Sequence, residues 1–159
     1  MSKQPLNSQN LISVQFQNRL IKIMDDFDCA ENNKKFASLA DVSQPVISRG
    51  VIYGIIPSVR ILQKIADTLN ISVSYLLGDT DKNDFFMAEP RSDFHTRLQE
   101  LTEEKHTNYG AISQKMQFPR TYFYEWLKDK TYPSLDYLKN IAEYFEVSLD
   151  YLLGRTNIR

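Results

Sequence analysis

The side chains best suited to metal or acid–base chemistry are few in this chain of 159 residues. His95 and His106 lie close together in the sequence, and Cys29 is the only cysteine. A zinc site needs three or four protein ligands with suitable spacing, and these three side chains do not complete one. The chain also lacks a glycine-rich phosphate loop and a plausible nucleophile–base pair. We therefore expect no catalytic residues, no metal site and no cofactor.

The strongest pattern is an internal duplication. The segment from Pro57 to Thr80 recurs from Pro133 to Thr156, with 11 of 24 positions identical. Both copies start with Pro-Ser and include a Tyr-Leu-Leu-Gly run near their end. The separation of the copies exceeds the roughly 20–50 residues of a solenoid repeat. The pattern therefore predicts two copies of a small domain.

Each copy is predicted to contain five short helices and no strand. Apolar residues at helical spacing mark the first helix of each copy, as at Phe16 and Leu20 and again at Phe94 and Leu98. These first helices are slightly further apart than the later ones, so the first copy has a small insertion in a loop near residues 25–31. The second and third helices are expected over residues 33–40 and 44–52, and over residues 109–116 and 120–128.

The turns between these helices carry recognisable signals. Asn32 and Asn108 precede the second helices, where an N-cap side chain is favourable. Asp41 tolerates a left-handed backbone, and Ser43 is expected to cap the third helix. A short helix, a tight turn and another helix form a helix-turn-helix. This arrangement can place its second helix in the major groove of DNA, which is about 12 Å wide.

The residues of this region resemble a known family. Ala37–Arg49 followed by Pro57-Ser58, and Ile112–Trp126 followed by Pro133-Ser134, look like the lambda-repressor-like (Xre-type) helix-turn-helix family. The resemblance implies an all-α fold with two tandem five-helix domains, residues 14–78 and 94–159. A polar arm, residues 1–13, precedes them, and a short acidic linker, residues 79–93, joins them. The implied function is a sequence-specific transcriptional regulator of bacterial or phage type that binds double-stranded DNA as a repressor.

The resemblance also implies roles for individual positions. Ile47 and Phe123 should be buried anchors of the third helices. Gln44 suits adenine, while Arg49 and Arg120 suit guanine. The full set expected to contact DNA comprises Asn33, Ser43, Gln44, Pro45, Arg49, Tyr109, Arg120, Thr121, Tyr124, Glu125, Lys128 and Lys130.

Several positions depart from the family pattern. Gly50 replaces a bulky residue, which should weaken its helix by up to about 1 kcal/mol. The loop expected after the third helix of the first copy is apolar, which favours a partner interface over a phosphate contact. Tyr122 is a large aromatic that could pack on a partner or on DNA. The residues expected at a partner interface are Val51, Ile52, Tyr53, Ile55, Ile56, Phe85 and Phe86.

The charge distribution leaves two functions open. The net charge is −1, with +2 over residues 1–78, −3 over residues 79–93 and 0 over residues 94–159. Proteins that bind nucleic acid usually have a basic surface, so the alternative is a protein-interaction or assembly module that has lost DNA binding in one or both copies.

The single cysteine and the lack of a long apolar run favour a cytoplasmic protein without a membrane segment. We expect a homodimer, and no small-molecule ligand is evident. Two DNA-binding copies would read half-sites about 34 Å apart.

Overall fold

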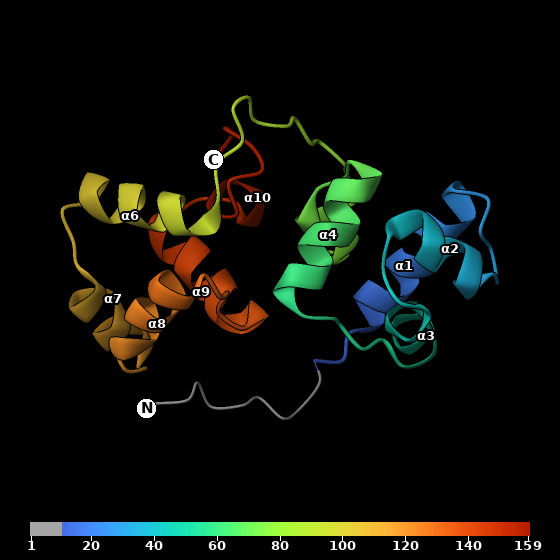
Figure 1. Cartoon of the computed structure of the whole chain (residues 1–159), viewed down its shortest axis with the longest axis horizontal. Coiled ribbons are helices and arrows are strands. Elements are labelled where there is room, and N and C mark those ends of the chain that lie inside the picture. The colour runs from blue at the N-terminus through green and yellow to red at the C-terminus, as the bar shows by residue number, and fades with distance from the viewer. Residues whose placement is uncertain (1–10) are drawn as a thin grey trace. The chain divides into compact units, whose positions relative to one another are not determined.

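The computed structural model describes residues 11–159, and this part of the chain is all-α, with ten helices and no strand (Figure 1). The all-α prediction is therefore confirmed for these residues. They divide into two compact units, residues 11–85 and residues 86–159. The arm predicted over residues 1–13 lies outside the described residues except for its last three positions. Within residues 11–159, every helix is too short or too polar to cross a membrane.

The first unit contains five helices, whose inward side chains form its core. The helices are α1 (Val14–Asp26), α2 (Asn33–Ala40), α3 (Gln44–Tyr53), α4 (Val59–Leu69) and α5 (Val73–Leu76). Helix α3 packs against both α1 and α2. Phe16, Leu20 and Phe36 are buried, and so is the predicted anchor Ile47, which is 1% exposed. One face of α3 is thereby fixed against the core.

The second unit repeats this order of helices. Its members are α6 (Phe94–Glu104), α7 (Tyr109–Met116), α8 (Thr121–Asp129), α9 (Leu135–Phe145) and α10 (Leu149–Leu152). The predicted anchor Phe123 is fully buried, as is Trp126. Phe118 joins them, with ring centroids 5.4 Å and 5.8 Å from those two side chains. The core of this unit around α8 is therefore largely aromatic.

Most of the predicted helix boundaries are confirmed by their caps. The side chains of Asn32 and Asn108 each accept a hydrogen bond from the backbone N–H three residues later, at 3.0 Å and 2.8 Å. Asp41 and Gln117 end α2 and α7 in the left-handed conformation, with φ of 58° and 61°. Both pairs of helices are thus joined by tight turns.

The prediction that Ser43 caps α3 is confirmed for its position but wrong for its side-chain hydrogen bond. Ser43 occupies the N-cap position, but its side chain makes no capping hydrogen bond. An N-cap side chain accepts from the second or third N–H of the helix. The second residue here is Pro45, which has no N–H. The N–H of the third, Val46, is bonded instead to the backbone carbonyl of Ser43 at 3.2 Å.

Gly50 is a packing requirement of the first unit. A Cβ atom at this position would lie 2.6 Å from Cδ2 of Leu20 and 3.2 Å from Cε2 of Phe16, both on α1. The missing side chain therefore lets α1 approach α3 closely. The equivalent position in the duplicated pattern of the second unit holds the buried Trp126. At this matching position the first unit has no side chain, whereas the second unit has a buried indole.

An arginine in the first helix of each unit ties the chain after the fifth helix to the core. The guanidinium of Arg19 lies 4.1 Å from the centre of the Tyr75 ring and donates hydrogen bonds of 2.7 Å to the carbonyls of Tyr75 and Thr80. In the second unit, the guanidinium of Arg97 lies 4.2 Å from the centre of the Tyr151 ring. It donates hydrogen bonds to the backbone carbonyl of Thr156 and to the side-chain oxygen of Asn157. These arginines are structural.

Arg97→Ala should lower the free energy of unfolding by about 1–3 kcal/mol, because it leaves the buried carbonyl of Thr156 without its donor. Urea denaturation followed by circular dichroism measures this change. Arg120→Ala is the matched control, because Arg120 is exposed and its side chain makes no hydrogen bond or ion pair with any of residues 11–159. Equal stability of the two variants would contradict a structural role for Arg97.

Candidate nucleic-acid interface

In the first unit, the outward face of α3 carries a stripe of side chains. Because an α-helix has 3.6 residues per turn, positions separated by three or four residues share one face. The stripe lines a shallow hollow of about 380 Å³ and consists of Gln44, Pro45, Ser48, Arg49, Ile52 and Tyr53. The opposite face carries the buried Ile47 and Gly50. Three of the predicted contact residues, Gln44, Pro45 and Arg49, are therefore brought together on an exposed surface.

The polar groups of this stripe are available for recognition. Gln44 and Arg49 are exposed, and the Arg49 side chain makes no hydrogen bond or ion pair with any of residues 11–159. A guanidinium and a carboxamide can each form two parallel hydrogen bonds to a base edge. Ser43 is also exposed but lies outside the hollow. Asn33, the first residue of α2, is half-buried, and its amide donates to Oγ of Ser48 over 3.4 Å.

The second unit has a hollow lined by α6, the start of α7 and α8. Its volume is about 640 Å³, and Tyr109, Arg120 and Tyr124 are among its lining residues. The ring of Tyr109 stacks on Phe123 at 4.9 Å and meets the edge of Tyr124 at 5.9 Å. The structure thus brings together three predicted contact residues, and the buried anchor Phe123 positions one of them.

The surface around this hollow combines several cations with one carboxylate, because Glu103 also lines it. Burial raises the pKa of the Tyr109 phenol above its ordinary value, so the hydroxyl stays protonated and can donate a hydrogen bond. Arg120, Lys128 and Lys130 are exposed, with Lys130 at the left-handed C-cap of α8. Of the other two predicted residues, Thr121 is exposed and Glu125 is half-buried. The exposed cations lie at both ends of α8.

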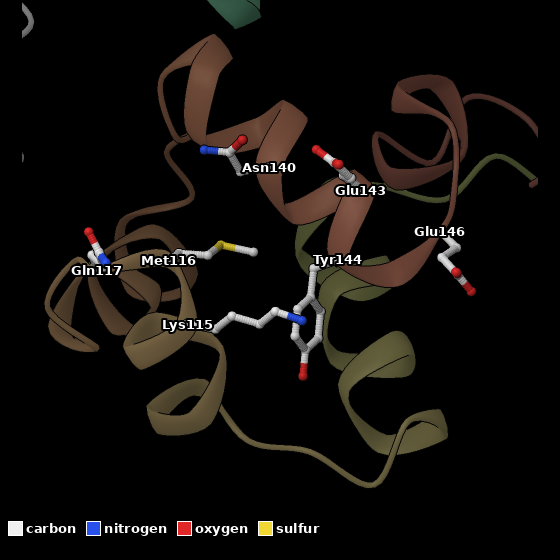
Figure 2. Close-up of a pocket in the computed structure, with 7 residues that line it drawn as sticks. All are labelled: Lys115, Met116, Gln117, Asn140, Glu143, Tyr144 and Glu146. Carbon is white, nitrogen blue, oxygen red and sulfur yellow. The ribbon is translucent and has the colours of Figure 1, made fainter.

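Lys115, another lysine of the second unit, is poorly placed to contact phosphate. Lys115, in the last turn of α7, has its ammonium 5.3 Å from the centre of the Tyr144 ring (Figure 2). The surrounding hollow, about 550 Å³, is also lined by Glu143 and Glu146. Two carboxylates repel phosphate, so this hollow does not extend the candidate interface.

The expected role of Tyr122 at a surface is wrong. Tyr122 is 5% exposed, and its ring stacks on Phe118 at 5.5 Å. It also lies 6.2 Å from the ring of Trp126. The neighbouring Tyr124 is 53% exposed. Tyr122 therefore belongs to the core, and Tyr124 is the aromatic side chain of α8 that a ligand can reach.

The apolar segment expected as a loop, residues 51–56, is divided by the structure. Val51, Ile52 and Tyr53 form the last turn of α3, which ends at the left-handed Gly54, with φ of 68°. The remaining two residues, Ile55 and Ile56, are half-buried against residues 11–13 of their own chain, with an antiparallel bridge and a 2.8 Å hydrogen bond. The need for a partner to cover this segment is therefore reduced.

The other apolar pair expected at an interface lies at the boundary between the two units. Phe85 is half-buried, whereas Phe86 is 66% exposed. Within residues 11–159, therefore, Phe86 is not covered by its own chain. Contact of this pair with a partner stays a prediction.

Comparison with known proteins gives one partial match. A segment of 62 residues, 39% of the chain, is 31% identical to the HTH-type transcriptional activator BcrR of Enterococcus faecalis. The chain covers 30% of the length of that relative. No family model matches the chain. No solved structure matches it either.

Proposed function

We propose that the protein is a sequence-specific DNA-binding transcriptional regulator of the lambda-repressor-like type. Its two helix-turn-helix domains would be residues 14–78 and 94–159, joined by the acidic linker of residues 79–93. The observation that carries the proposal is the exposed stripe on α3, where Gln44 and Arg49 line the same hollow, on a helix that follows a short helix and a tight turn. The partial similarity to a transcriptional regulator supports the same class.

In this proposal α3 and α8 enter the major groove, and the residues named above contact the DNA. Gln44 pairs with adenine, and Arg49 and Arg120 pair with guanine. Asn33 and Tyr109, at the starts of α2 and α7, contact phosphate, because N-terminal helix N–H groups favour anions. The repressor role and the homodimer remain predictions. The relative is described as a transcriptional activator, so the comparison supports regulation of transcription and not repression in particular.

The test is binding of the full chain to duplex DNA as a function of salt. A protein that contacts phosphates loses affinity linearly in log salt, with a slope of about −0.9 per contact. Lys128→Ala should therefore reduce the magnitude of the slope by about 1 on cognate and random duplexes alike. Lys115→Ala is the matched control, since Lys115 packs on Tyr144, and it should leave the slope unchanged. The absence of any binding at low salt would overturn the proposal.

The second candidate function is a protein-interaction module in which one or both units do not bind DNA. The net charge of −1 and the exposed apolar side chains of Ile52 and Tyr53 favour it. Under this alternative, binding to DNA is absent or confined to one unit. Because α3 and α8 belong to different units, substitutions on the outward face of each helix test DNA binding by one unit at a time. A unit whose substitutions leave DNA affinity unchanged fits the protein-interaction alternative.

A further inference from the structure

The outward stripe of α3 changes from polar to apolar along the helix. Gln44 and Arg49 occupy its first two turns, whereas Ile52 and Tyr53, which are 58% and 63% exposed, occupy its last turn. All four line the same hollow. An occupant that covers the whole stripe therefore needs both hydrogen-bonding groups and an apolar group.

A major-groove surface offers both. Base edges present hydrogen-bond donors and acceptors, and thymine adds the C5-methyl group, which is the apolar feature of the groove. A protein partner seated on Ile52 and Tyr53 would also cover Arg49 in the same hollow and remove it from base contact. Thymine is therefore the occupant that agrees with the whole stripe.

We propose that Ile52, with Tyr53 beside it, contacts the C5-methyl group of a thymine and so determines part of the sequence specificity. This inference rests on the proposed DNA-binding function and names a base for a surface that the sequence pattern had favoured as a protein interface. Loss of the methyl group removes about one buried carbon from the contact. The expected cost is about a fourfold weaker affinity.

The position of the thymine follows from helix geometry. Ile52 lies two helical turns after Gln44, which corresponds to about 12 Å along the helix axis at roughly 1.5 Å per residue. Base pairs are about 3.4 Å apart along the duplex. The thymine should therefore lie no more than about three or four base pairs from the base that Gln44 contacts, on the side toward the C-terminal end of α3.

The test begins with selection of bound sites from a random duplex library by the full chain. The same selection with Gln44→Ala identifies the base that Gln44 contacts, because the variant should lose the preference for one base at that position. Each thymine of the selected site is then replaced in turn by deoxyuridine, which lacks only the methyl group. Affinity is measured for the wild-type chain, for Ile52→Ala and for Ile21→Ala. Ile21 is the matched control, because it is an isoleucine of similar exposure, 46%, on α1.

The expected result is about a fourfold loss at one thymine for the wild-type chain and for Ile21→Ala, and no loss there for Ile52→Ala. No sensitivity to deoxyuridine, or equal sensitivity in all three proteins, would overturn the thymine contact while leaving DNA binding intact. A lower oligomeric mass of Ile52→Ala in sedimentation, with its deoxyuridine response unchanged, would assign the surface to a second copy instead. Failure to enrich any site would overturn the proposed function itself.

Discussion

Arg49→Ala and Arg120→Ala should each weaken binding to the cognate DNA site by about 1–3 kcal/mol and relax the preference for one base. The double variant should lose about 2–6 kcal/mol, since the two arginines belong to different units and their side chains share no partner in residues 11–159. Each guanidinium is exposed and can form two hydrogen bonds to guanine. Fluorescence anisotropy with a labelled duplex measures the three affinities.

The single variants also report which unit reads DNA. A loss confined to Arg120→Ala would assign base reading to α8 and leave the first unit for another task. Equal losses on cognate and random duplexes would show that the arginines contact phosphate and not bases. Arg97→Ala is not a suitable control here, because Arg97 is buried and supports the fold. Lys115→Ala serves this purpose.

Phe123→Ala should destabilise the second unit by about 3–5 kcal/mol. Its ring is fully buried and lies 4.9 Å from Tyr109, 5.4 Å from Phe118 and 5.2 Å from Trp126. A small unit is stabilised by only about 0.05–0.15 kcal/mol per residue, so this loss is comparable with the whole stability of residues 86–159. Urea denaturation monitored by tryptophan fluorescence is suitable, because Trp126 is the only tryptophan.

The control for Phe123→Ala is Tyr124→Ala, the next residue along α8. Tyr124 is 53% exposed, and its ring contributes only an edge contact to Tyr109. We expect Tyr124→Ala to change stability by less than about 1 kcal/mol and to weaken DNA binding. Similar destabilisation by both substitutions would show that Phe123 does not anchor the helix.

Periodicity and capping residues predicted most of the helices because both signals are local. The apolar spacing of α1 and α6 and the caps at Asn32 and Asn108 depend on residues within a few positions of each other. Gly50 shows where this reasoning stops. Its role depends on the approach of Leu20 from another helix that is distant in the sequence, and helix propensity contains no information on that approach.

The candidate interface was predicted less completely than the fold. The predicted helix ends at Ile52 and leaves Tyr53 outside it, although Gly54 offers a usable signal, since glycine in the left-handed conformation often ends a helix. The structural arginines Arg19 and Arg97 had no clear signal beyond their recurrence at matching positions of the first helix in each copy. Many of their hydrogen bonds go to backbone carbonyls, and a carbonyl is present at every position of the chain.

The opposite residues at positions 50 and 126 restrict how the duplicated halves can exchange parts. Transfer of residues 44–53 into the second half would place Gly50 where Trp126 stands and leave an indole-sized void. The reverse transfer would drive an indole into Leu20. We therefore expect exchange of this helix between the halves to destabilise the unit that receives it. Substitutions of the exposed side chains of α3 and α8, such as Arg49 and Lys128, avoid this packing conflict, so these surfaces can change separately in the two halves.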